Sequence, residues 1–300
     1  LRVKLDDDIV PVEMPYHSDT SDAIYTALDF AQQGKIDNEH RTLNAPGFFQ
    51  ARTDVAAVDE FDWPNPAEFI DPAACRAAVE AVDGERVILG VLWSAHFQDV
   101  CAAFGLETAF MRFFDAPDLV QAISARIVDF YLKANEIFFE ATQGKLDAVL
   151  IGNDYGSQTG LMLSPNHVRE FAFDGAKQLI DQAKSYDVKV IYHSCGGIRD
   201  IIPGLIDLGV DAIHPIQALA AGMEANGLAA DFGDQVSFCG GVDHQNLLVN
   251  GTPDEVRAKV RALRTLFPTG LIISPSHEAI LPDIAPENLA AMFEAARETA

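Results

Sequence analysis

Short apolar runs alternate with longer amphipathic stretches along most of this chain. The apolar runs are rich in Val and Ile, which is typical of strands. They span residues 86–93, 148–153, 188–193, 212–216, 236–239 and 271–274. The stretches between them predict helices over 117–142, 165–185, 198–208, 252–266 and 286–298. Because continuous apolar strands that are each followed by a helix are typical of a covered parallel sheet, the pattern predicts an α/β fold.

The strand–helix unit recurs from residue 86 to residue 300, which suits either a doubly wound sheet or a (β/α)8 TIM barrel. Residues 1–85 are expected to be irregular, with one strand over 9–13, because proline and glycine punctuate segments such as 63–66 and 47–57. No break in composition separates a second domain, so we expect one domain over residues 1–300. Since Leu1 is not an initiator methionine, we expect the natural N-terminus to be trimmed or disordered.

The composition excludes several classes of function. The chain has 45 acidic and 21 basic residues, for a net charge of −24, and such a surface repels nucleic acids and anionic membranes. No apolar run is long enough to span a bilayer, and no leader pattern is visible. The four cysteines are scattered without a disulfide spacing, which favours reduced thiols in the cytoplasm.

Polar residues follow nearly every predicted strand at its C-terminal end, where an α/β barrel builds its active site. Such residues can also have a purely structural role: Asp154 and Asp243 can cap helices, and His96 and His214 can be core histidines. We call such a role the ordinary alternative. Their convergence at one end of the strands nevertheless predicts a catalytic site. The residues are His96, Asp154, Tyr155, His193, Cys195, His214, Gln217, Cys239, Asp243, His244, Gln245, His277 and Glu278.

The segment His193-Ser194-Cys195-Gly196-Gly197 carries the most chemistry. Residues two apart on a strand point to the same face, so the imidazole and the thiol leave the strand together. The glycine pair then lets the backbone turn sharply. Zinc could sit between the two side chains, and the alternative is a buried histidine beside an inert cysteine.

Several motifs together resemble the uroporphyrinogen decarboxylase superfamily over roughly residues 60–300. They are His193-Ser-Cys195-Gly-Gly, Gly209-Val-Asp211-Ala-Ile-His-Pro215-Ile-Gln217, Gly240-Gly-Val-Asp243-His-Gln245, Gly251-Thr-Pro-Asp-Glu-Val256, Ser274-Pro-Ser-His277 and Pro286-Glu-Asn288. The resemblance implies a (β/α)8 barrel with its active cleft at the strand C-termini. It also implies one of two chemistries, which are decarboxylation of a tetrapyrrole and zinc-dependent methyl transfer between a corrinoid protein and a thiol.

The His-x-Cys element favours the methyltransferase branch, in which a histidine, a cysteine at this spacing and a later cysteine hold zinc. Here the resemblance gives His193 and Cys195 as ligands, but the later position offers His277 instead of a cysteine. Asp154 or Glu278 could add a carboxylate. Replacing a thiolate by an imidazole makes the metal more electrophilic, so the substrate could carry oxygen, as an ether or alcohol does, rather than sulfur.

The sequence thus predicts a cytoplasmic, zinc-dependent methyltransferase that works with a corrinoid protein and a small methyl donor or acceptor, and with neither nucleic acid nor a membrane. Asp154 and Asp243 would be catalytic. The residues expected to bind substrate are His96, Tyr155, His214, Gln217, His244 and Gln245.

Two alternatives stay open. A decarboxylase would need an arginine-rich N-terminal segment, whereas this one holds only Arg2, Lys4, Lys35, Arg41 and Arg52. The second alternative is a family member that binds a metal and a small molecule without turnover.

Overall fold

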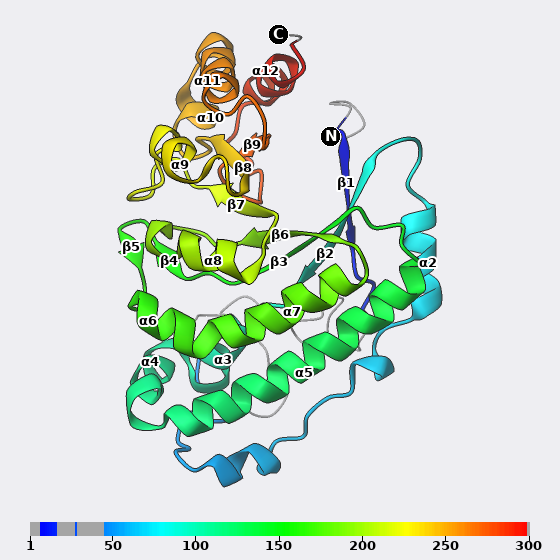
Figure 1. Ribbon diagram of the computed structural model, residues 1–300, viewed down its shortest axis with the longest axis vertical. Helices are drawn as coiled ribbons and strands as arrows, with labels where there is room; N and C mark the ends of the chain where they lie inside the picture. Colours follow the sequence, from blue (N-terminus) through cyan, green and yellow to red (C-terminus); the bar gives the residue numbers. More distant parts are fainter. Residues whose placement is uncertain (1–6, 17–27, 29–44, 299–300) are drawn as a thin grey trace. The chain divides into compact units, whose positions relative to one another are not determined.

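A computed structural model of the chain describes residues 7–16, 28 and 45–298 (Figure 1). The decarboxylase alternative refers to basic residues at positions 2, 4, 35 and 41, and these positions lie outside the described residues. The chain divides into two compact units. Counting only the described residues, the N-terminal unit falls within Ile9–Asn153 and Asn166–Lys189, and the C-terminal unit comprises residues 7–8, Asp154–Pro165 and residues 190–298.

Three parallel strands run through the N-terminal unit in the order β1-β2-β3. They are β1 (Ile9–Glu13), β2 (Val87–Trp93) and β3 (Ala148–Gly152). Every residue of β3 is buried, as a continuous apolar run predicts for a strand covered on both faces. The strands expected over 9–13, 86–93 and 148–153 are therefore confirmed.

Helices make up most of the N-terminal unit. The long helix α5 (Pro117–Thr142) and α7 (Asp174–Ser185) run alongside each other in Figure 1, and Gln182 Nε2 of α7 donates to the Leu132 carbonyl of α5 at 2.7 Å. The remaining elements are 3-10 helices at Val55–Glu60 and Pro66–Glu68, α2 (Pro72–Glu80), α3 (His96–Phe104), α4 (Leu106–Asp115) and α6 (Pro165–Val168).

Three features of these helices differ from the sequence prediction. Helix α2 lies within residues 1–85, which were expected to be irregular, because a proline at its first position and Asp71 as its N-cap start a regular helix there. The helix expected over 165–185 contains a π-helical stretch at Arg169–Phe173, between α6 and α7. Helices α3 and α4 were not predicted, because Gly105, with φ of +83°, separates two short helices that are each only two to three turns long. Short helices give too few repeats for a period to stand out.

The C-terminal unit holds four parallel strands in the order β6-β7-β8-β9, counting β6 from Val190 on. They are β6 (Lys189–His193), β7 (Ala212–Ile216), β8 (Ser237–Val242) and β9 (Leu271–Pro275). A short hairpin pairs β4 (Gly156–Ser157) with β5 (Gly160–Leu161). The helices are a 3-10 turn at Arg199–Ile201, α8 (Ile202–Leu208), α9 (Ala225–Phe232), α10 (Leu247–Asn250), α11 (Pro253–Leu266) and α12 (Pro286–Ala296).

Helices α11 and α12 illustrate how the sequence defines elements locally. A capping box between Thr252 and Glu255 starts α11, and both members satisfy backbone amides that the first turn leaves without partners. Buried Val256, Val260 and Leu263 then face buried residues of α12, among them Leu289 and Met292. The apolar stripe of each helix thus forms a shared core.

The structure confirms a parallel α/β fold in which strands and helices alternate. Seven parallel strands occur among the described residues, so the eighth strand and the closed barrel stay predictions. A single domain over 1–300 also stays a prediction. Within the described ranges, no helix combines the length and apolar character that a bilayer crossing requires.

Candidate metal centre

Two glycines bring the segments that carry the candidate ligands together. Gly196 follows Cys195 with φ of +87°, and a Cβ added there would lie 2.4 Å from the carbonyl carbon of Gly156. A Cβ added at Gly156 would in turn lie 2.7 Å from the carbonyl oxygen of Cys195. Only glycine at both positions permits this contact between backbones. It places the chain just after Asp154 against the chain just after His193.

The side chains of Asp154, His193 and Cys195 form a compact donor cluster in the C-terminal unit. His193 Nε2 lies 3.2 Å from Asp154 Oδ1 and 3.4 Å from Cys195 Sγ. Asp154 Oδ1 also accepts the backbone N–H of Cys195 at 2.8 Å. The donor atoms of all three residues lie within 4.8 Å of one another. Nitrogen, oxygen and sulfur ligands at this separation suit zinc, and three protein ligands leave a fourth position for substrate.

The electrostatics of the cluster also fit a divalent cation. Burial, followed by the charges of Asp154 and Glu278, raises the pKa of the Cys195 thiol well above its usual value. Burial opposes ionisation of Asp154, but hydrogen bonds with His193 and Cys195 outweigh it and lower the pKa of that carboxyl. A thiolate beside two carboxylates is therefore unfavourable without a counter-ion, and a bound cation would supply one.

A second group of donors adjoins the first through Cys195. Its Sγ lies 4.0 Å from Glu278 Oε2, and Glu278 Oε1 lies 3.5 Å from His277 Nε2. His277 Nδ1 accepts the backbone N–H of Ala279 at 3.1 Å, so the neutral ring carries its proton on Nε2. An Nε2 that bears a proton has no lone pair for a metal. In this arrangement His277 is suited to exchanging a proton with Glu278 rather than to ligation.

Two residues predicted to bind substrate contact the segment that carries His193 and Cys195. His214 is buried, and its Nδ1 lies 2.8 Å from Nδ1 of His193. Burial, followed by the nearby His193 and His277, lowers the pKa of His214 to about 3. Gln217 Oε1 accepts the backbone N–H of Gly196 at 2.6 Å. Both side chains therefore support the segment that carries His193 and Cys195.

Tyr155 and Asp243 both have partners within the C-terminal unit, and those of Asp243 match its alternative as a helix cap. The Tyr155 hydroxyl lies 2.8 Å from that of Tyr192, and Tyr155 is only 1% exposed. Asp243 accepts the backbone N–H groups of Gln245 at 2.9 Å and of Leu247 at 3.0 Å, so both carboxylate oxygens serve the start of α10. A substrate-binding role for Tyr155 and a catalytic role for Asp243 stay predictions.

The remaining predicted substrate-binding residues lie in three different environments. His244 Nδ1 lies 3.2 Å from Ser276 Oγ, and its ring stacks on that of His277 with centroids 4.8 Å apart. Gln245 is exposed at the C-terminal side of β8. His96 belongs to the N-terminal unit and is fully buried.

His96 has partners on both ring nitrogens. Its Nε2 donates to the Ala172 carbonyl in the π-helical stretch at 3.0 Å, and its Nδ1 accepts from Asn153 Nδ2 at 3.2 Å. A Cβ added at Gly175 would lie 2.9 Å from this ring. His96 therefore has the environment of a core histidine, which was the ordinary alternative.

The supporting residues Gly156 and Ser194 were not singled out from the sequence. Ser194 Oγ accepts the backbone N–H of Tyr155 at 3.1 Å, which ties together the same two segments as Gly156. Both residues are neighbours of predicted ligands, at Asp154-Tyr155-Gly156 and His193-Ser194-Cys195. That adjacency was the available signal, but small residues near a motif give no chemical indication of which contacts they make.

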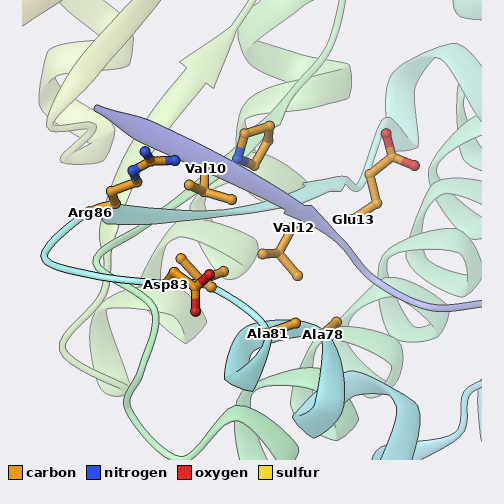
Figure 2. Close-up of a pocket in the computed structure, with 9 residues that line it drawn as sticks. Val10, Val12, Glu13, Ala78, Ala81, Asp83 and Arg86 are labelled. Carbon is orange, nitrogen blue, oxygen red and sulfur yellow. The ribbon is translucent and has the colours of Figure 1, made fainter. Parts of the chain in front are cut away.

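A cavity of about 390 Å³ lies in the N-terminal unit, and Figure 2 shows residues that line it. Strand β1 contributes Val10, Val12 and Glu13, and the segment after helix α2 contributes Asp83 and Arg86. The lining contains neither histidine nor cysteine. The cavity shares no residue with the donor cluster and does not resemble a zinc site.

Comparison with known proteins agrees with the motifs. The chain matches the family model for uroporphyrinogen decarboxylase (URO-D) over residues 43–299 and belongs to that family. Among solved structures, a methyltransferase from Methanosarcina mazei is similar in fold, with a TM-score of 0.58 and 19% sequence identity. That match covers 74% of this chain and 61% of the methyltransferase chain. A search of curated proteins gave no match. The family resemblance that the motifs predicted is therefore confirmed.

Proposed function

We propose that this protein is a zinc-dependent methyltransferase that moves a methyl group between a corrinoid protein and a small thiol or oxygen substrate. The observation that carries the proposal is the donor cluster of Asp154, His193 and Cys195, whose ligand atoms lie within 4.8 Å of one another. The fold likeness to a methyltransferase supports the same branch of the family.

The proposed ligands are His193, Cys195 and Asp154. The sequence pattern favoured His277 as the third ligand, but the proton that its Ala279 contact assigns to Nε2 favours Asp154 instead. When bound, zinc supplies a Lewis acid that lowers the pKa of a coordinated thiol or hydroxyl. The protein holds that position open because only three side chains take part.

The neighbouring polar residues would manage the substrate's proton and orientation. His277 Nε2, 3.5 Å from Glu278, can pass a proton between the substrate and the carboxylate. The exposed amide of Gln245 can bind the substrate's polar groups, and Asp243 keeps the backbone of Gln245 in place through its capping contacts.

The ligand set favours an oxygen-bearing substrate. A single thiolate among the three ligands donates less charge to the metal than two would, which leaves the metal more electrophilic. Such a metal would stabilise an alkoxide well and would make a bound thiolate less nucleophilic. A methyl ether or an alcohol is thus the proposed substrate class.

The carboxylates around Cys195 count against the decarboxylase alternative. Asp154 Oδ1 lies 3.2 Å from His193 Nε2, and Glu278 Oε2 lies 4.0 Å from Cys195 Sγ. A tetrapyrrole with many carboxylates would meet like charge there unless a metal intervened.

The test uses purified, zinc-loaded protein, methylcobalamin and a panel of thiols and alcohols, with corrinoid absorbance reporting methyl transfer. Cys195→Ser should lose both zinc and demethylation of the corrinoid. Cys75→Ser is the matched control, because Cys75 is a buried thiol of helix α2 in the other unit. If wild-type protein holds no stoichiometric zinc and Cys195→Ser keeps full activity, the proposal is wrong.

A further inference from the structure

The His193 ring lies against a second histidine. His193 Nδ1 and His214 Nδ1 lie 2.8 Å apart, and the ring centroids are 5.0 Å apart. Two imidazole nitrogens at this distance share one proton, so one of them donates and the other accepts. The assignment of that proton determines which nitrogen of His193 carries a lone pair.

The opposite edge of the His193 ring faces the other two members of the donor cluster. Its Nε2 lies 3.2 Å from Asp154 Oδ1 and 3.4 Å from Cys195 Sγ. For Nε2 to bind a metal, the ring proton must sit on Nδ1, and this proton then needs an acceptor. Nδ1 of His214, 2.8 Å from Nδ1 of His193, is placed to accept this proton.

We propose that His214 is a positioning residue for the metal centre. When the metal is bound, its Nδ1 would accept the Nδ1–H of His193 and thereby leave the Nε2 lone pair of His193 for the metal beside Asp154 and Cys195. The inference rests on the proposed function for the presence of the metal, and it adds a residue that acts only through His193.

The backbone fixes the two rings relative to each other. His193 and His214 are paired in register on the neighbouring parallel strands β6 and β7, so their side chains leave the same face of the sheet. The Ser194 N–H also donates to the His214 carbonyl at 2.8 Å. His193 is 3% exposed and His214 is 8% exposed, so water competes little for the shared proton.

His277 provides an internal contrast. Its Nδ1 accepts a backbone N–H from Ala279, whereas Nδ1 of His193 faces another ring nitrogen that can accept. His193 therefore has an acceptor within reach of Nδ1 and can leave Nε2 free for a metal. The Ala279 contact instead leaves the neutral His277 ring with its proton on Nε2, where it can be exchanged.

Metal affinity and spectroscopy test the proposal without any need for turnover. Each purified variant is stripped of metal and titrated with Co²⁺, and the Co²⁺ visible bands and the sulfur-to-metal charge-transfer band are recorded. Zn²⁺ affinity follows from competition. His214→Phe keeps a ring of similar size and removes the acceptor, and it should weaken Zn²⁺ binding by about 10–100-fold and alter the Co²⁺ spectrum.

Two further variants separate positioning from packing. His214→Asn offers an amide oxygen near the place of Nδ1 and should recover most of the affinity that His214→Phe loses. Ile213→Val, at the fully buried neighbouring position of β7, should leave affinity unchanged. If His214→Phe binds Zn²⁺ like the wild type, or if His214→Asn is no better than His214→Phe, the inference is wrong.

A measurement on the wild type covers the case in which His214→Phe does not fold. Two-dimensional ¹H–¹⁵N spectra of the zinc-loaded protein report the tautomer of each histidine. They should show His193 protonated at Nδ1 and ligated through Nε2, and the reverse assignment would overturn the inference. Normal metal binding with no methyl transfer would overturn the proposed function instead, and leave the role of His214 supported.

Discussion

Zinc binding should release about one proton from the protein, and that proton should come from Cys195. The raised pKa of the Cys195 thiol means that it is protonated in the metal-free protein near neutral pH. The lowered pKa of Asp154 means that this carboxyl is already ionised there and has no proton to lose. A metal-bound cysteine is a thiolate, so the thiol proton must leave as the metal enters.

The release of one proton sets the pH dependence of affinity. Each fall of one pH unit should cost about 1.4 kcal/mol of binding free energy, which is about tenfold in Kd. The sign follows from the thiol: a lower pH stabilises the protonated, metal-free form. The slope should persist to pH values above the ordinary pKa of a cysteine, because burial and two carboxylates raise the pKa of this one.

Isothermal titration calorimetry in buffers of different ionisation enthalpy measures both the Kd for zinc and the number of protons that binding releases. Zinc is titrated into metal-free protein at about pH 8, and the dependence of the heat on the buffer gives the number of protons released. Cys195→Ser serves as the comparison, because any zinc that it binds through Asp154 and His193 should release fewer protons. A Kd that does not vary with pH, or a release equal in both proteins, would refute the reasoning.

Three other perturbations test the structure around the site. Gly156→Ala places a Cβ 2.7 Å from the Cys195 carbonyl oxygen, so zinc affinity should fall at least tenfold in the competition assay. The control Gly227→Ala, whose Cβ meets only the end of the Arg199 side chain, should leave zinc affinity unchanged. Asp243→Asn keeps one oxygen and so one of the two capping contacts. A large drop in kcat with little change in melting temperature would indicate catalysis, and an unchanged kcat would indicate capping alone. Gly175→Ala should destabilise the protein by about 1–3 kcal/mol in urea unfolding, because its Cβ would crowd His96; a neutral result would show that the π-helical stretch can adjust.

The strands and the family came from patterns that are local in sequence. Helix α5 begins at Pro117 and ends at Thr142, as its pattern predicted, because a proline at the first position and an amphipathic period are encoded within the helix itself. The pair His193 and Cys195 was equally local, since strand β6 ends at His193 and Cys195 follows two residues later. Helices α3 and α4 were not predicted, because each is too short for its hydrophobic period to be detected.

Only the tertiary structure shows the contacts on which the proposed ligand set rests. The backbone N–H of Ala279 donates to Nδ1 of His277, which is why we propose Asp154 as the third ligand, and such a contact leaves no mark on residue types. His214 meets His193 only through the register of two strands, and Gly156 meets Cys195 only because two backbones approach closely. The sequence by itself determined which chemical groups gather at the ends of the strands. Which group donates, accepts or ligates depends on distances of a few tenths of an ångström between distant segments, and only the packed chain sets these.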